Sequence, residues 1–185
     1  YTLYEPESVE AALGLIDRVK QMSQRSSRAE LPHPITILEA GALLPDLSKE
    51  VLDAVAELHP VWTKDMSEAR MAARQFGMER AGAADERDVC AFLSDALDSI
   101  VVVRTEGGTW IADGATPRFL SVAKEEIQFP GRLNTIHVGT LAAELALGAD
   151  LEESVAWANA AAMRAATIGG LSEAISRQNV APMVA

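Results

Sequence analysis

Apolar and polar positions follow two alternating patterns along this chain. Short, β-branched apolar runs occur at 35–38, 61–63 and 100–103, and each is the length of a buried strand. The segments between them are longer, and their apolar residues recur at helical spacing. These amphipathic segments predict helices over 8–22, 48–59, 65–76, 85–97, 134–147 and 150–168.

Capping and breaking residues set the expected boundaries. Tyr1 to Tyr4 suit a short strand, and Ser8 suits the N-cap of the first helix. Residues 24–34 are polar and contain prolines, which predicts a loop. Ser48 suits the N-cap of the second helix, and Pro60 its end.

Residues 99–122 change the period from helix to strand. The apolar run 100–103 leads to Gly107 and Gly108, and two further short strand-like runs follow. This order predicts a strand and a hairpin. Strands that alternate with helices indicate a mostly parallel sheet with helices on both faces. Ligands of such sheets bind beyond the carboxyl ends of the strands.

Composition narrows the classes of function. The chain has 185 residues, is 49% hydrophobic and carries a formal net charge of −11. That acidity disfavours binding to nucleic acid through a basic patch, and binding to an anionic membrane surface. No apolar run has the length of a membrane span. Cys90 is the single cysteine, so we expect no internal disulfide and a cytoplasmic or other reducing compartment.

A glycine-containing turn precedes the helix expected from about Asn134. A turn followed by a helix is a common phosphate cradle, because bare backbone N–H groups and the helix dipole meet the anion there. Here Arg132, Leu133 and Asn134 follow Gly131, where phosphate chemistry would favour small residues and a carboxylate.

Several segments together resemble the PfkB (ribokinase-like) carbohydrate kinases. They are HPVWTKDMSEA at 59–69, VVVRTEGGTWIADG at 101–114, the signature at 129–141, and WANAAAMRAATIGG at 157–170. The resemblance covers nearly the whole chain but only the later part of the family's. It implies a three-layer α/β/α domain over 1–185 with a mostly parallel sheet, without the family's N-terminal part and lid.

The resemblance also implies roles for the turn residues. The family's D-T-x-G-A-G-D stretch holds the transferred phosphate of ATP, and its last Asp is the catalytic base. Gly131 keeps the first glycine, Arg132 and Leu133 replace the small residue and the second glycine, and Asn134 stands at the base position. An amide is no general base near neutral pH. Arg132 has two interpretations: a direct phosphate ligand, or a solvated side chain on a relaxed turn.

Asp65 and Glu68 match the family's N-x-x-E segment, with Asp in place of Asn. The resemblance implies that Glu68 organises Mg²⁺ through its waters, near the nucleotide phosphates. The other interpretation is purely structural: Asp65 as N-cap and Glu68 at N3 form a capping box. The two interpretations are compatible.

Three further residues match the family's nucleotide side. Thr105 and Gly108 align with the two glycines of its T-x-G-x-x-G turn, and Asn159 lies on the adenine-side helix. Gly107 and Gly108 would serve any hairpin equally well. His137, one turn beyond Asn134, is more typical of a packing or helix-surface residue than of a catalyst.

The damaged motif favours a non-catalytic, structural or interaction subunit with a PfkB-like fold. The alternative is an ATP-dependent carbohydrate or nucleoside kinase whose N-terminal half lies outside these residues, with a sugar as substrate. A nucleotide-binding regulator without turnover lies between the two. We expect a homo-oligomer or a larger protein assembly, because a sheet without its early strands leaves an edge and apolar surface to be covered.

Overall fold

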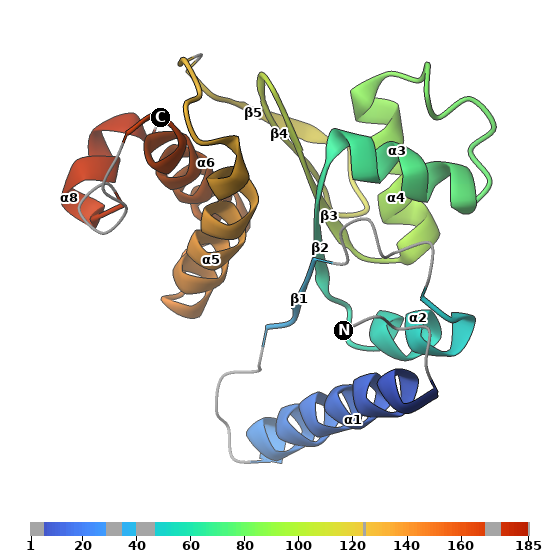
Figure 1. Ribbon diagram of the computed structural model, residues 1–185. Helices are drawn as coiled ribbons and strands as arrows, with labels where there is room; N and C mark the ends of the chain where they lie inside the picture. The colour runs from blue at the N-terminus through green and yellow to red at the C-terminus, as the bar shows by residue number, and fades with distance from the viewer. Residues whose placement is uncertain (1–5, 29–34, 40–46, 124, 169–174, 185) are drawn as a thin grey trace.

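The computed structural model describes residues 6–28, 35–39, 47–123, 125–168 and 175–184. Its centre is a five-stranded sheet in which spatial order follows chain order (Figure 1). The strands are β1 (Ile37–Leu38), β2 (Val61–Asp65), β3 (Ile100–Thr105), β4 (Gly108–Ala112) and β5 (Arg118–Ser121). The expected strand at residues 1–4 lies outside the described residues.

The sheet is mixed. β1 pairs with β2 and β2 with β3 in parallel, whereas the pairings β3–β4 and β4–β5 are antiparallel. The parallel part is the predicted strand–helix alternation, and the antiparallel part contains the predicted hairpin, since β3 and β4 are joined by the two residues Glu106 and Gly107.

Helices cover both faces of the sheet, which confirms the predicted three-layer α/β/α class (Figure 1). α3 (Met66–Gln75) and α4 (Glu86–Leu97) lie on one face, and α5 (Leu133–Ala146) and α6 (Leu151–Thr167) on the other. α1 (Pro6–Arg28) packs against α2 (Lys49–Ala56). α8 (Arg177–Val180) and the 3₁₀ helix η3 (Ala181–Met183) follow α6.

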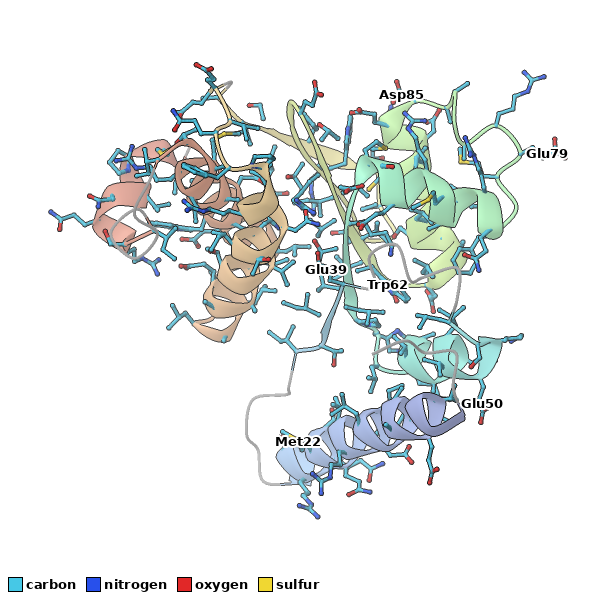
Figure 2. All side chains as sticks on the ribbon, viewed as in Figure 1. Met22, Glu39, Glu50, Trp62, Glu79 and Asp85 are labelled. Carbon is cyan, nitrogen blue, oxygen red and sulfur yellow. The ribbon has the colours of Figure 1, made fainter. Side chains whose placement is uncertain are left out.

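Strand alternation divides the core in two. Trp62, Val101 and Val103 pack with residues of α3 and α4, and Figure 2 labels Trp62 at this core. Val102 and Ile111, which point the other way, pack with α5 and α6. Side chains of successive strand residues alternate between faces, so residue 104 belongs to the α5 side of the sheet.

Two expected boundaries at the first helix were wrong. α1 begins at Pro6, so Ser8 lies inside its first turn and is not the N-cap. Proline suits the first helical position because its missing N–H would be unpaired there in any case. α1 also continues to Arg28, five residues into the expected loop. Residues 24–28 contain no proline or glycine, and their polarity alone does not end a helix.

The predicted Ser48 cap is confirmed, and Asp150 caps a second helix. The Ser48 side chain accepts a hydrogen bond from the amide of Val51 at 3.3 Å, at the start of α2. Asp150 accepts one from the amide of Glu153 at 2.8 Å, at the start of α6. None of the described helices is both long enough and apolar enough to cross a membrane.

Candidate functional site

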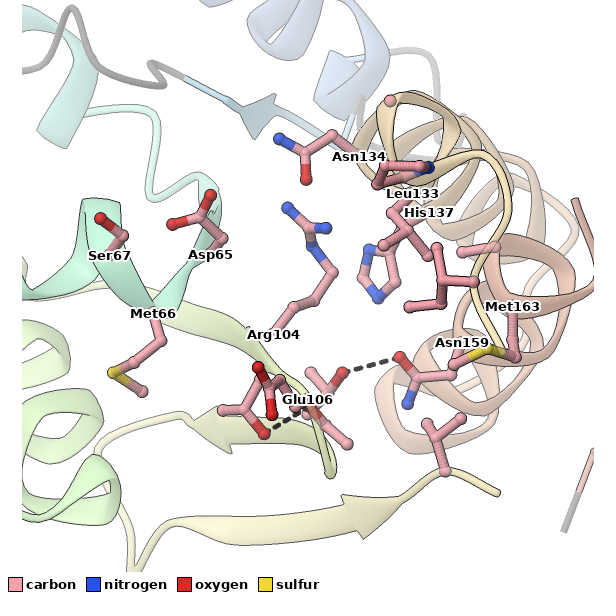
Figure 3. Close-up of a pocket in the computed structure, with 18 residues that line it drawn as sticks. Asp65, Met66, Ser67, Arg104, Glu106, Leu133, Asn134, His137, Asn159 and Met163 are labelled. Carbon is pink, nitrogen blue, oxygen red and sulfur yellow. Dashed lines mark hydrogen bonds between the residues drawn. The ribbon is translucent and has the colours of Figure 1, made fainter. Parts of the chain in front are cut away.

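A cavity of about 580 Å³ lies where β2 and β3 end, bounded on one side by the start of α3 and on the other by α5 and α6 (Figure 3). This is the edge where the sequence predicted a ligand site. Several candidate residues line the cavity: Asp65, Thr105, Gly108, Gly131, Leu133, Asn134 and Asn159. The remaining two candidates, Arg132 and Glu68, are not among its lining residues.

A capping box closes the start of α3. Asp65 accepts a hydrogen bond from the amide of Glu68 at 2.8 Å, and the Glu68 carboxylate accepts one from the amide of Asp65 at 3.2 Å. This confirms the structural interpretation of the pair. No three acids, histidines or cysteines among the described residues form a group that could hold a metal ion. A role for Glu68 in holding Mg²⁺ through water stays a prediction.

The start of α5 is built differently. A 3₁₀ helix, η2 (Pro130–Arg132), leads into it, and no side chain caps it. The amide of Arg132 donates to the Phe129 carbonyl at 3.1 Å, and the amide of Leu133 donates to the Pro130 carbonyl. Both amides are therefore used within the turn. A phosphate cradle needs such amides free.

Gly131 has no conformational need to be glycine here. Its φ is not positive, and an added Cβ would meet no heavy atom within 4 Å. Leu133 has ordinary helical angles, with φ −54° and ψ −52°. The turn thus has no residue in the left-handed conformation that would favour glycine over a residue with a side chain.

The Arg132 side chain is bonded to the C-terminal end of α6. Its guanidinium donates to the carbonyl oxygens of Ala165 at 3.2 Å and Ile168 at 3.0 Å, and it lies 4.1 Å from the centre of the Phe129 ring. The side chain therefore caps the C-terminal end of α6, where cations are favourable. This contact explains its place outside the cavity lining. The expectation of a solvated Arg132 was wrong.

Thr105 and Gly108 build the β3–β4 hairpin. The Thr105 hydroxyl donates to the Gly108 carbonyl and accepts from the Gly107 amide, both at 3.2 Å. Gly108 has φ +150°, and a Cβ there would lie 2.1 Å from the Leu120 carbonyl oxygen. Only glycine fits where β4 passes so close to β5. Both residues have a structural role besides lining the cavity.

Asn159 links the hairpin to α6. Thr109 donates from its hydroxyl to the Asn159 side-chain oxygen at 2.7 Å (Figure 3). The amide nitrogen of Asn159 is buried without a hydrogen-bond partner. Asn159 also borders a second cavity of about 560 Å³, formed by β5, α6 and η3. The nitrogen is thus a free donor where the two cavities meet.

The sequence interpretation missed Arg104, a cavity residue at the carboxyl end of β3. Its Nε and Nη2 atoms are buried and have no hydrogen-bond partner. Burial lowers the pKa of its guanidinium, against the opposing charges of Asp65, Glu39 and Glu68. An arginine nevertheless stays charged in proteins.

His137 is buried as expected of a packing residue, but it also lines the cavity. Neither ring nitrogen has a hydrogen-bond partner within 3.5 Å, although the Asn159 side chain lies near enough to favour the charged imidazole. Burial, together with the positive charge of Arg104, outweighs Asn159 and lowers the pKa of His137 to about 3. The imidazole is therefore neutral at pH 7, with one N–H to donate.

Lys64 is a buried cation near this edge, although it does not line the cavity. It is fully buried on β2, and its ammonium lies 5.1 Å from the Trp62 ring centre without a hydrogen-bond partner. Burial lowers its pKa to about 8, while Glu68, Asp65 and Glu39 oppose that shift. One sequence signal could have revealed Lys64 and Arg104: each interrupts an otherwise buried strand one residue before its end.

The fold is that of the ribokinase-like carbohydrate kinases. No protein-family model matches the chain, and no curated protein matches it in sequence. Among solved structures, it is similar to a double mutant of Vibrio cholerae fructokinase with fructose, ADP and potassium ion bound, at 17% identity and a TM-score of 0.68. That match covers 100% of this chain and 58% of the fructokinase.

Two ribokinases are similar as well. The enzyme from Cryptococcus neoformans in complex with ADP is 14% identical, with a TM-score of 0.69, over 91% of this chain and 55% of that one. The ribokinase of Thermotoga maritima is 18% identical, with a TM-score of 0.62, over 88% and 52%. The chain thus spans about half the length of these kinases. At such identities the likeness establishes the fold alone.

Proposed function

We propose that this protein is a degenerate ribokinase-like module that binds a nucleotide or another phosphorylated small molecule without transferring its phosphate. The observation that carries the proposal is the start of α5. Asn134 lines the cavity where the resemblance implies a catalytic Asp, and the amides of Arg132 and Leu133 are already bonded within the turn.

No other cavity residue is a good substitute for the base. With its pKa lowered to about 3, His137 is too weak a base to take a proton near neutral pH. Asp65 uses its Oδ1 atom as the cap of α3. Glu106, the other carboxylate of the lining, lies exposed on the hairpin turn. Positioning without a base supports binding more than turnover.

The nucleotide part of the proposal rests on the nucleotide side of the cavity. The buried amide nitrogen of Asn159 is a free donor, and the fructokinase and the Cryptococcus ribokinase both hold ADP. In this chain Asn159, Thr105 and the Gly108 turn would hold the nucleotide, and Glu68 would contact Mg²⁺ only through water. Bound ATP would supply the phosphoryl group of the family reaction.

The proposal includes a partner. α1 exposes Leu15, at 65%, and Met22, at 56% (Figure 2), and such apolar positions favour a homo-oligomer or a larger protein assembly. Sedimentation of the native protein tests this part. A stable monomer that binds no other chain at cellular concentrations would contradict the proposed oligomer or assembly.

A coupled ATPase and sugar-kinase assay tests the catalytic part. The native protein is compared with a variant carrying Arg132→Ala, Leu133→Gly and Asn134→Asp. We expect no turnover from the native protein, together with a measurable affinity for ADP. Turnover at about 1–100 per second, the ordinary range of kinases, would contradict the proposal.

The alternative function is an active ATP-dependent carbohydrate or nucleoside kinase, with its acceptor-binding part on residues outside this chain. The open cavity of about 580 Å³ favours it, because a purely structural module has no need of one. The same assay separates the two. If only the triple variant turns over, the altered turn is the cause of inactivity; if the native protein does, the kinase is correct.

A further inference from the structure

Two polar side chains of the cavity have no partner for their buried atoms. Arg104, from β3, and His137, from α5, lie beside each other across the cavity floor (Figure 3). The unpartnered atoms are Nε and Nη2 of Arg104 and both ring nitrogens of His137. The exposed fraction of His137 is 0%. Buried polar atoms in native proteins are nearly always hydrogen-bonded, so four together need an explanation.

Other arginines of the chain show what a paired guanidinium looks like here. Arg118 forms ion pairs with Asp113 at 2.8 Å and Glu152 at 2.6 Å. Arg177 pairs with Glu144 at 2.9 Å. No ion pair within 4.0 Å joins Arg104 to any described carboxylate. Arg104 is half-buried, but its Nε and Nη2 atoms are shielded from solvent and have no partner. Unpaired donors that line a cavity are candidates for contacts with a ligand.

The neighbouring carboxylate of Asp65 is not free to neutralise Arg104. In Figure 3 it points toward the start of α3 and away from the guanidinium, because its Oδ1 atom caps α3 and the capping box fixes its orientation. Asp65 therefore lowers the local positive potential without contacting the donors. An incoming anion would find the Nε and Nη2 donors of Arg104 unused.

We propose that Arg104 and His137 form a side-chain site for one phosphate group of a small-molecule ligand, in place of the α5 backbone amides. The guanidinium donates two parallel N–H bonds to two phosphate oxygens, and the neutral imidazole donates one N–H to a third. Three donors match the three terminal oxygens of a phosphate group, whereas a carboxylate has two. The inference rests on the proposed ligand-binding function and assigns its anion contacts.

Removing the Arg104 charge should weaken phosphate binding without lowering the melting temperature. Arg104→Met keeps the aliphatic stem and removes the unpaired charge, so its melting temperature should equal or exceed that of the native protein. Its affinity for phosphate should fall at least tenfold, because charge-assisted bonds are lost. Arg118→Met, which removes an exposed and paired arginine of the same sheet, should leave phosphate affinity unchanged.

Calorimetric titration of the native protein and both variants with inorganic phosphate, and separately with ADP, measures these affinities. His137→Gln, which retains an N–H donor, should weaken binding less than His137→Leu. Two results would overturn the site: no phosphate binding by the native protein at millimolar concentrations, or equal affinity in the native protein and Arg104→Met. A lower melting temperature of Arg104→Met with unchanged binding would likewise make Arg104 structural.

These outcomes are separable from the proposed function. Turnover by a native protein whose phosphate affinity still depends on Arg104 would refute the non-catalytic proposal and leave the anion site standing. If the native protein shows no turnover and its phosphate affinity does not depend on Arg104, the anion site is refuted and the non-catalytic proposal stands. ADP that binds well to Arg104→Met, while inorganic phosphate does not bind to the native protein, would count against the site and in favour of recognition through the Asn159 side.

Discussion

Two helices begin at the same cavity, and their first turns differ. At α3, Asp65 and Glu68 exchange hydrogen bonds with each other's amides, so the helix start is satisfied by its own side chains. At α5 no side chain caps the helix, no acid lies in its first turn, and the preceding 3₁₀ turn takes up two amides. The start of α3 is therefore satisfied by its own side chains, whereas at the start of α5 the amides of Arg132 and Leu133 are bonded within the turn.

The two sides of the cavity also differ in the titratable and charged side chains near each helix start. The α3 side places carboxylates at the ends of the strands, whereas the α5 side places His137 opposite Arg104. Under the proposal above, anion binding in this cavity would depend on side chains and not on the backbone amides of α5. Three measurements of stability test the difference between the two helix starts.

The largest change in stability should come from Gly108, one of the two glycines that match the kinase motifs. Gly108→Ala should lower the free energy of unfolding by about 3–5 kcal/mol, because its Cβ would overlap the Leu120 carbonyl oxygen at positive φ. Gly131→Ala, the matched control, has open space and should change it by no more than about 0.5 kcal/mol. Urea denaturation of both variants measures this. A large loss from Gly131→Ala would mean that the turn is tighter than described.

His137 should make stability fall at acidic pH. Its pKa is about 3 in the folded protein and about 6.5 when unfolded, so between these values the unfolded chain binds more protons. His137 should then remove up to about 1.4 kcal/mol per pH unit as the pH falls below 6.5, or about 3 kcal/mol at pH 4.5. Denaturation curves from pH 7 to 4.5 measure the slope. His137→Gln should flatten it, and an equal slope in that variant would assign the effect to other groups.

The caps should give the smallest effect on stability. Asp65→Ala removes a satisfied cap and should cost about 1 kcal/mol. Asn134→Ala, at the corresponding start of α5, removes no capping hydrogen bond and should be nearly neutral. Thermal melting of the two variants checks the difference. Equal losses would show that the two helix starts are more alike than their hydrogen bonds indicate.

Local patterns predicted the scaffold well. The alternation of strands and helices, the hairpin after Gly107 and the Asp65 capping box each depend on neighbouring residues, and each is present. The start of the first helix was wrong because Ser8 was preferred over Pro6 as the boundary residue. Its end was wrong because polar residues 24–28 remain good helix positions.

The cavity chemistry was less predictable. The sequence left Arg132 with two interpretations, a phosphate ligand or a solvated side chain, but its guanidinium reaches carbonyls of α6 more than 30 residues away. Arg104 and His137 meet only when β3 and α5 are packed together. Whether a buried donor has a partner depends on such long-range contacts, which no local pattern contains.

Phosphorus NMR of the native protein with ATP tests whether the cavity binds phosphate groups without transferring them. The native protein is mixed with an excess of ATP, Mg²⁺ and a panel of sugars and nucleosides, and phosphorus NMR follows both the bound phosphate resonances and the ADP formed. We expect shifted or broadened ATP phosphate resonances and no ADP beyond that of a protein-free sample. Stoichiometric phosphorylation of any acceptor within seconds would contradict it, because Asn134 and the turn before it would then support phosphoryl transfer.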